Sequence, residues 1–192
     1  MPVALKAITC AIALWIGSVS VSFGTEVDFD NRAFMPAGQT TSVPVGAFQF
    51  CRRHSAECTT AGATVSHADL SEDSWAQLQQ TNNAFNLTIR PVTDLVQYGA
   101  EEHWTYPDQS GDCEDYVLAK RRELLSEGWP ASTLMVAVVR RPDGEGHAVL
   151  VVRTDRGDLV LDNLRSEISL WVDTPYEYVK QSASLASWVS VR

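Results

Sequence analysis

A cysteine, a histidine and an aspartate occur in the order and the local settings that thiol catalysis requires. Cys113 follows Gly111 and Asp112 at the start of a predicted helix, where free backbone amides and the helix dipole favour a thiolate and can hold an oxyanion. His147 opens an apolar strand after two glycines, and Asp162 ends the next apolar strand. Because an acid that orients the imidazole completes a catalytic triad, Cys113, His147 and Asp162 are the candidate catalytic residues.

The register of the predicted hairpin sets a condition on this triad. A turn centred on Arg156 places His147 opposite about position 165, so a bulge or an earlier turn is needed to bring Asp162 to the imidazole. Taken singly, each of the three residues is more often structural than catalytic. The combination is more specific, because an unpaired cysteine, a helix start and a His–Asp hairpin occur together.

Three carboxylates flank the candidate nucleophile, at Asp112, Glu114 and Asp115. Unopposed, they raise the pKa of the Cys113 thiol and disfavour the thiolate. Either a protonated His147 or a bound cation must compensate, and hard carboxylate oxygens favour calcium over zinc. The segment lacks the glycine and the final glutamate of an EF-hand, so a calcium site here is of another kind.

The cysteines and the first residues indicate an exported protein. Residues 1–24 have the pattern of a signal peptide: Lys6, an apolar run, and small residues at the cleavage positions. The apolar run is short for a stable membrane span, which favours cleavage over an uncleaved anchor. An exported chain can form disulfides, and Cys51 with Cys58 is the simplest local pair. With Cys10 removed in the leader, Cys113 is then the cysteine left over.

The remaining composition narrows the classes of function. The chain has 192 residues and a net charge of −9, which suits one acidic globular domain. This charge argues against nucleic-acid binding and against docking on anionic lipid, but it is compatible with a divalent cation. No segment after the leader is apolar enough to enter a membrane, so no stable insertion is expected once the signal is removed.

Periodicity predicts an α+β domain. Residues 25–47 are rich in small residues and predict an irregular N-terminal arm, followed by one domain over residues 48–192. Helices are expected at 67–86 and 113–127, with Asp112 as the cap of the second and Lys120, Arg121 and Arg122 on its solvent side. Strands are expected at 134–139, 148–152, 159–161 and 188–191. Helices followed by strands indicate an antiparallel sheet with helices packed on it.

These motifs together resemble a known family. The run from Gly111 to Tyr116, the run His147-Ala148-Val149-Leu150, and Leu161-Asp162-Asn163 resemble the bacterial transglutaminase-like cysteine proteinases, which include the LapG-type periplasmic proteases. The resemblance extends from about Phe48 to Trp188, nearly the whole mature chain. It implies a papain/transglutaminase-like core, with the nucleophile helix packed on an antiparallel sheet.

The resemblance also implies roles for single residues. Cys113 would be the nucleophile, His147 the general base and Asp162 the orienting acid of a cysteine endopeptidase that passes through a thioester. Calcium would bind beside the nucleophile through Asp112 and Glu114, with Asp115 as a weaker candidate. Trp104 would contribute an oxyanion-hole donor or wall the site, and the wall is favoured.

Partners and compartment follow from the same resemblance. It implies an exported, periplasmic enzyme with a protein substrate, a surface adhesin in some family members, and a membrane-bound regulator. Two other functions remain open: acyl transfer to an amine, as in true transglutaminases, and a catalytically silent calcium-dependent binding domain. The complete triad argues against the silent domain.

Overall fold

The computed structural model describes residues 32–59 and 64–191 and shows an α+β fold built on one antiparallel sheet. The strands lie in the order β1-β9-β8-β4-β5-β6-β7. Their bounds are β1 Ala37–Thr41, β4 Leu134–Arg140, β5 Gly146–Thr154, β6 Gly157–Leu161, β7 Ser169–Leu170, β8 Glu177–Ser184 and β9 Ser187–Val191. A separate parallel pair joins β2 (Arg90–Pro91) to β3 (Ser110–Gly111). The predicted fold class is confirmed.

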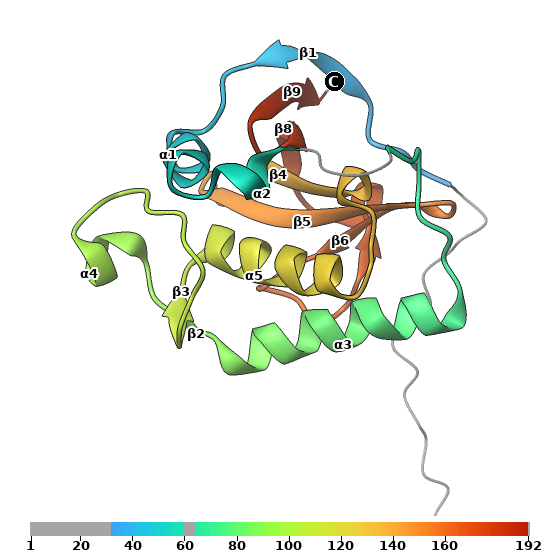
Figure 1. Ribbon diagram of the computed structural model, residues 1–192, viewed down its shortest axis with the longest axis horizontal. Helices are drawn as coiled ribbons and strands as arrows, with labels where there is room; N and C mark the ends of the chain where they lie inside the picture. Colours follow the sequence, from blue (N-terminus) through green and yellow to red (C-terminus); the bar gives the residue numbers. More distant parts are fainter. Residues whose placement is uncertain (1–31, 60–63, 192) are drawn as a thin grey trace, which may run out of the picture.

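The helices gather on one face of the large sheet. They are α1 Val45–Arg53, α2 Ser55–Cys58, α3 Glu72–Thr88, α4 Asp94–Tyr98 and α5 Cys113–Ser126, with 3-10 turns at Ala131–Thr133 and Trp171–Asp173. Figure 1 shows α5 between α3 and the sheet, so α5 is enclosed on both sides. This layering places the start of α5 beside the start of β5.

The central strands are buried on both faces. Along β5, Leu150 and Val152 pack into the cluster that the helices share, whereas Val149 and Val151 pack into a second cluster on the opposite face. Side chains alternate between the faces of a strand, so both sets must be apolar. This explains why β4 and β5 read as continuous apolar runs in the sequence.

Some sequence-based expectations need correction. The expected irregular arm over 25–47 contains β1 and the first residues of α1 within its described part. Lys120 and Arg121 do not face solvent: Lys120 is 1% exposed and Arg121 is 6% exposed. Lys120 is covered by α3, where its Nζ donates to Asn82 Oδ1 at 2.7 Å. Arg121 is covered on another side of α5, where its Nε donates to Leu134 O at the start of β4 at 3.3 Å. Arg122 is exposed, as expected.

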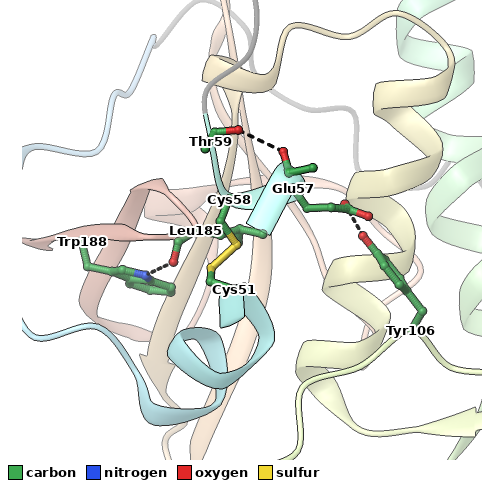
Figure 2. Close-up of a disulfide and its surroundings, with 8 residues drawn as sticks. Cys51, Glu57, Cys58, Thr59, Tyr106, Leu185 and Trp188 are labelled. Carbon is green, nitrogen blue, oxygen red and sulfur yellow. Dashed lines mark hydrogen bonds between the residues drawn. A yellow bond between two sulfur atoms is a disulfide. The ribbon is translucent and has the colours of Figure 1, made fainter. Parts of the chain in front are cut away.

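The predicted disulfide is present and joins the end of α1 to α2. Cys51 and Cys58 are bonded beside Leu185 and Trp188, as Figure 2 shows. In the same view the Tyr106 hydroxyl donates to a carboxylate of α2, that of Glu57. The two short helices are therefore fixed to the sheet and to the segment that precedes the nucleophile.

Two expectations concern the membrane. Of the helices within residues 32–59 and 64–191, none is long and apolar enough to cross a bilayer. The predicted signal peptide at 1–24 lies outside the described residues.

We expect replacement of Gly157 by alanine to destabilise the β5–β6 hairpin. Gly157 has φ +119°, and an added Cβ would lie 2.9 Å from Ala33 O and 2.8 Å from Leu170 Cδ2. Conformational strain and overlap together should lower the free energy of unfolding by about 3 kcal/mol. Gly144→Ala is the matched control, because Gly144 has φ +90° but open space around it. Urea unfolding should show a clearly smaller loss for this control, and equal losses would contradict the overlap.

Candidate active site

The Cys113 sulfur lies at the junction of α5 and β5. Cys113 is the first residue of α5, and its thiol donates to Glu114 Oε2 at 3.3 Å. A hydrogen bond from the Ala148 backbone also reaches the sulfur, which places the sulfur next to the chain at His147. Burial, followed by the Glu114 carboxylate, raises the pKa of the Cys113 thiol well above its ordinary value.

His147 and Asp162 meet as the sequence predicted. His147 Nε2 lies 2.9 Å from Asp162 Oδ1, and both side chains are buried. An ionised carboxylate only accepts, so Nε2 carries the proton and Nδ1 is the basic nitrogen. Nδ1 has no hydrogen-bond partner among the described residues.

The hairpin register explains this contact without a bulge. Thr154 pairs with Gly157 and Leu150 with Leu161, so the turn is tighter than one centred on Arg156. If the pairing continues by one residue, Asp162 lies opposite Val149. His147 is two residues from Val149 on the same strand and is therefore the diagonal neighbour of Asp162. Diagonal neighbours on adjacent strands lie within reach of long side chains. The sequence argument considered only directly opposed residues and therefore overstated the mismatch.

Further donors hold the Asp162 carboxylate. The Leu164 backbone N–H donates to Oδ1 at 2.9 Å, and the Tyr176 hydroxyl donates to Oδ2 at 2.5 Å. The Tyr176 ring also meets the His147 ring edge-on, with centroids 5.6 Å apart. Burial alone would raise the pKa of Asp162, but the hydrogen bonds, led by that of His147, hold it below its ordinary value.

A cluster of three carboxylates lies beside the sulfur. Ligand atoms of Asp94, Asp112 and Glu114 lie within 4.8 Å of one another. Asp94 Oδ1 and Asp112 Oδ1 are buried without a hydrogen-bond partner. Burial, followed by Asp112, raises the pKa of Glu114 to about 10, and burial also raises the pKa of Asp94. No lysine or arginine in the described part of the chain forms an ion pair with these carboxylates.

The structure changes the set of candidate metal ligands. Asp115 is not part of the cluster: its Oδ1 accepts from the Thr105 backbone at 2.8 Å, and its carboxyl packs against Gly111. Asp94 is part of it, although the sequence analysis did not predict this role. Asp112 does not cap α5 with its side chain, because its Oδ2 accepts from the Asp94 backbone N–H at 3.0 Å.

Cys113, Glu114 and His147 line a cavity of about 470 Å³. Cys113 and His147 open into it, together with Trp104, Glu102 and Glu145. The Trp104 side chain is buried, and its indole N–H donates to Glu102 Oε2 at 3.0 Å. The cavity therefore offers a thiol and an imidazole, with three carboxyl groups and one lysine, Lys180, among its other lining residues.

Sequence reasoning missed two residues of this site. Asp94 begins a short helix far from the nucleophile in sequence, and a single aspartate at a helix start carries no signal of ligation. Tyr176 lies in a loop before β8, a strand that was itself not predicted. Only tertiary packing brings Asp94 to Asp112 and Tyr176 to Asp162.

We expect Tyr176→Phe to lower stability in a pH-dependent way. Burial, followed by the Asp162 carboxylate, raises the pKa of Tyr176 to about 12, so its hydroxyl remains a donor at neutral pH. The pKa of Asp162 is lowered by folding. Its stabilisation is thus present above the unfolded value of about 3.9 and is lost as pH falls through the folded value.

The variant should lose about 1.5 kcal/mol near pH 7, and the loss should disappear in acid once Asp162 is protonated. Denaturant unfolding between pH 2 and pH 7 gives the comparison. Tyr178→Phe is the matched control, because the Tyr178 hydroxyl bonds Thr174 rather than Asp162. A loss for Tyr176→Phe that does not change with pH would contradict the assigned hydrogen bond.

Comparisons with known proteins identify the family and the fold. The family model described as "Bacterial transglutaminase-like cysteine proteinase" matches residues 37–192. A comparison with curated protein sequences finds no match.

Solved structures of LapG from Legionella pneumophila share the fold. The calcium-bound structure is 25% identical with a TM-score of 0.53, and the match covers 60% of this chain and 68% of LapG. The EGTA-treated structure is 25% identical with a TM-score of 0.54, over 62% of this chain and 68% of LapG. Because the family model spans most of the chain, the protein belongs to the bacterial transglutaminase-like cysteine proteinase family.

Proposed function

We propose that the protein is a cysteine endopeptidase that uses Cys113, His147 and Asp162 as a triad. The observation that carries the proposal is the buried His147–Asp162 hydrogen bond beside a cavity that also contains Cys113. Asp162 fixes the imidazole tautomer and orientation, and His147 takes the thiol proton on Nδ1.

The reaction follows from these positions. The Cys113 thiolate adds to the carbonyl carbon of a peptide bond, and backbone amides at the start of α5 stabilise the oxyanion. His147 then donates its proton to the leaving amine as the carbon–nitrogen bond breaks, which leaves a thioester. Water, deprotonated by His147, hydrolyses the thioester and restores the thiol. Trp104 is assigned as a wall of the cavity, because its indole N–H is already bonded to Glu102.

We also propose that calcium binds the carboxylate cluster. Buried carboxylate oxygens without hydrogen-bond partners, namely Asp94 Oδ1 and Asp112 Oδ1, fit a hard divalent cation, and the related LapG structure is described as calcium-bound. Asp94, Asp112 and Glu114 would hold the ion. Its positive charge would offset the carboxylates that now raise the pKa of the Cys113 thiol.

The site of action is proposed on sequence grounds. The leader predicted at 1–24 supports export, and the Cys51–Cys58 disulfide is consistent with an oxidising compartment. A periplasmic location, an adhesin-like protein substrate and a membrane-bound regulator remain proposals from the family resemblance. The leader at 1–24 and the extent of the single domain stay predictions as well.

We expect calcium to stabilise the protein through Asp94. At a calcium concentration 100-fold above the dissociation constant, linkage adds about 2.7 kcal/mol to the free energy of unfolding. Asp94→Asn should remove most of this gain, as measured by thermal unfolding with calcium or chelator and by titration calorimetry. Asp108→Asn is the control, because Asp108 is exposed in the same segment and outside the cluster. Equal gains in both variants would contradict the assigned site.

The products distinguish the proposed peptidase from an acyltransferase. Incubated with a proteome-derived peptide library in calcium, the protein should generate new peptide N-termini, detected by mass spectrometry. Cys113→Ser and His147→Ala should lose this activity by about a thousandfold or more. Added methylamine should leave the main products unchanged if water attacks the thioester. Amine incorporation without new N-termini would instead identify an acyltransferase, and no product of either kind would contradict an enzymatic function.

A further inference from the structure

Helix α3 contributes no residue to the proposed triad, but it holds the loop that follows Asp162. Asn86 Nδ2 donates to Asp162 O at 2.8 Å and to Arg165 O at 3.0 Å. Asn82 Nδ2 donates to Arg165 O at 3.2 Å and to Ser166 O at 3.1 Å. Residues four apart lie on one face of a helix, so the two amides act as adjacent supports for residues 162–166.

A buried lysine fixes the orientation of Asn82. Lys120 is 1% exposed, and its Nζ donates to Asn82 Oδ1 at 2.7 Å. An ammonium group can only donate, so it holds Oδ1 toward α5 and thereby directs the Asn82 amino group toward the loop carbonyls. Lys120 lies seven residues after Cys113 on the same helix. Helix α5 thus carries both Cys113 and the lysine that orients Asn82 toward the loop after Asp162.

Packing alone does not account for a lysine at this position. Burial lowers the pKa of Lys120 to about 7, with the Asp162 carboxylate acting in the opposite direction. An apolar side chain of similar volume would avoid this desolvation cost, and such replacements of buried charges are often neutral or stabilising. The hydrogen bond between Lys120 and Asn82 therefore indicates that the orientation of the Asn82 amide matters.

We propose that Lys120 and Asn82 are positioning residues that hold the 162–166 loop so that the Asp162 carboxylate stays on His147. The proposal rests on the proposed function, because it assigns the link a role in activating Cys113. It adds a specific dependence: the thiol reactivity of Cys113 should depend on an amide that touches neither Cys113 nor His147.

The test compares stability with thiol reactivity in four variants. These are Asn82→Leu, Lys120→Met, the double variant Asn82→Leu/Lys120→Met, and Asn83→Leu as a matched control on the exposed side of α3. Each variant is measured by thermal unfolding and by the rate of iodoacetamide alkylation of Cys113 at pH 7 in calcium. Asp162→Asn serves as the reference for loss of the acid.

Asn82→Leu leaves the Lys120 ammonium buried without its partner, so its melting temperature should fall clearly. The double variant replaces both groups by apolar ones, so its melting temperature should recover toward that of the wild type. Its alkylation should nevertheless remain about tenfold or more slower than that of the wild type, because Arg165 O and Ser166 O still lack the hydrogen bonds from Asn82. Asn83→Leu should alkylate at the wild-type rate.

Two results would overturn the inference, and they are distinguishable. If the double variant alkylates as fast as the wild type while Asp162→Asn is slow, the network is only structural and the triad stands. If Asp162→Asn itself alkylates at the wild-type rate, the proposed triad fails and the positioning role fails with it.

Discussion

The accumulation of negative charge around one buried thiol is the constraint on which the rest of the site depends. Burial and the Glu114 carboxylate oppose ionisation of Cys113, although the start of a helix favours it. In the proposed site two groups would overcome this opposition: the imidazole of His147 and a cation held by the carboxylates. Both require side chains from segments distant in sequence, so the fold must bring β5, β6, α4 and α5 to one place.

The layered arrangement meets this requirement with rigid elements. The β5–β6 hairpin places Asp162 diagonally from His147, and α5 starts where β5 starts. The disulfide links α1 to α2. Gly46 in α1 packs directly against Trp104, because an added Cβ at Gly46 would lie 2.1 Å from the indole ring. Arg53 also donates to Trp104 O at 2.6 Å. The wall of the cavity is therefore held by a crosslinked module rather than by a free loop.

Local patterns in the sequence were enough to predict the α5 helix, the central strands, the disulfide and the contact between His147 and Asp162. The catalytic role of the candidate triad stays a prediction. The helix, the strands and the hairpin contact depend on residues close in sequence, and the disulfide had one simple local pairing. The prediction failed where tertiary packing decides: Lys120 was placed in solvent because a third layer cannot be read from one helix. For the same reason Asp94 and Tyr176 were missed as parts of the site, and β1, with its polar and small residues, gave no alternating signal.

The central claim is that His147 activates the Cys113 thiol, and the pH dependence of iodoacetamide alkylation tests it most directly. With calcium present, the wild-type protein should alkylate rapidly well below the free-thiol pKa of about 8.5. His147→Ala should move the titration back to that value or above it. Slow alkylation with ordinary thiol titration, unchanged in His147→Ala, would contradict an activated Cys–His pair and leave a calcium-dependent binding domain as the better account.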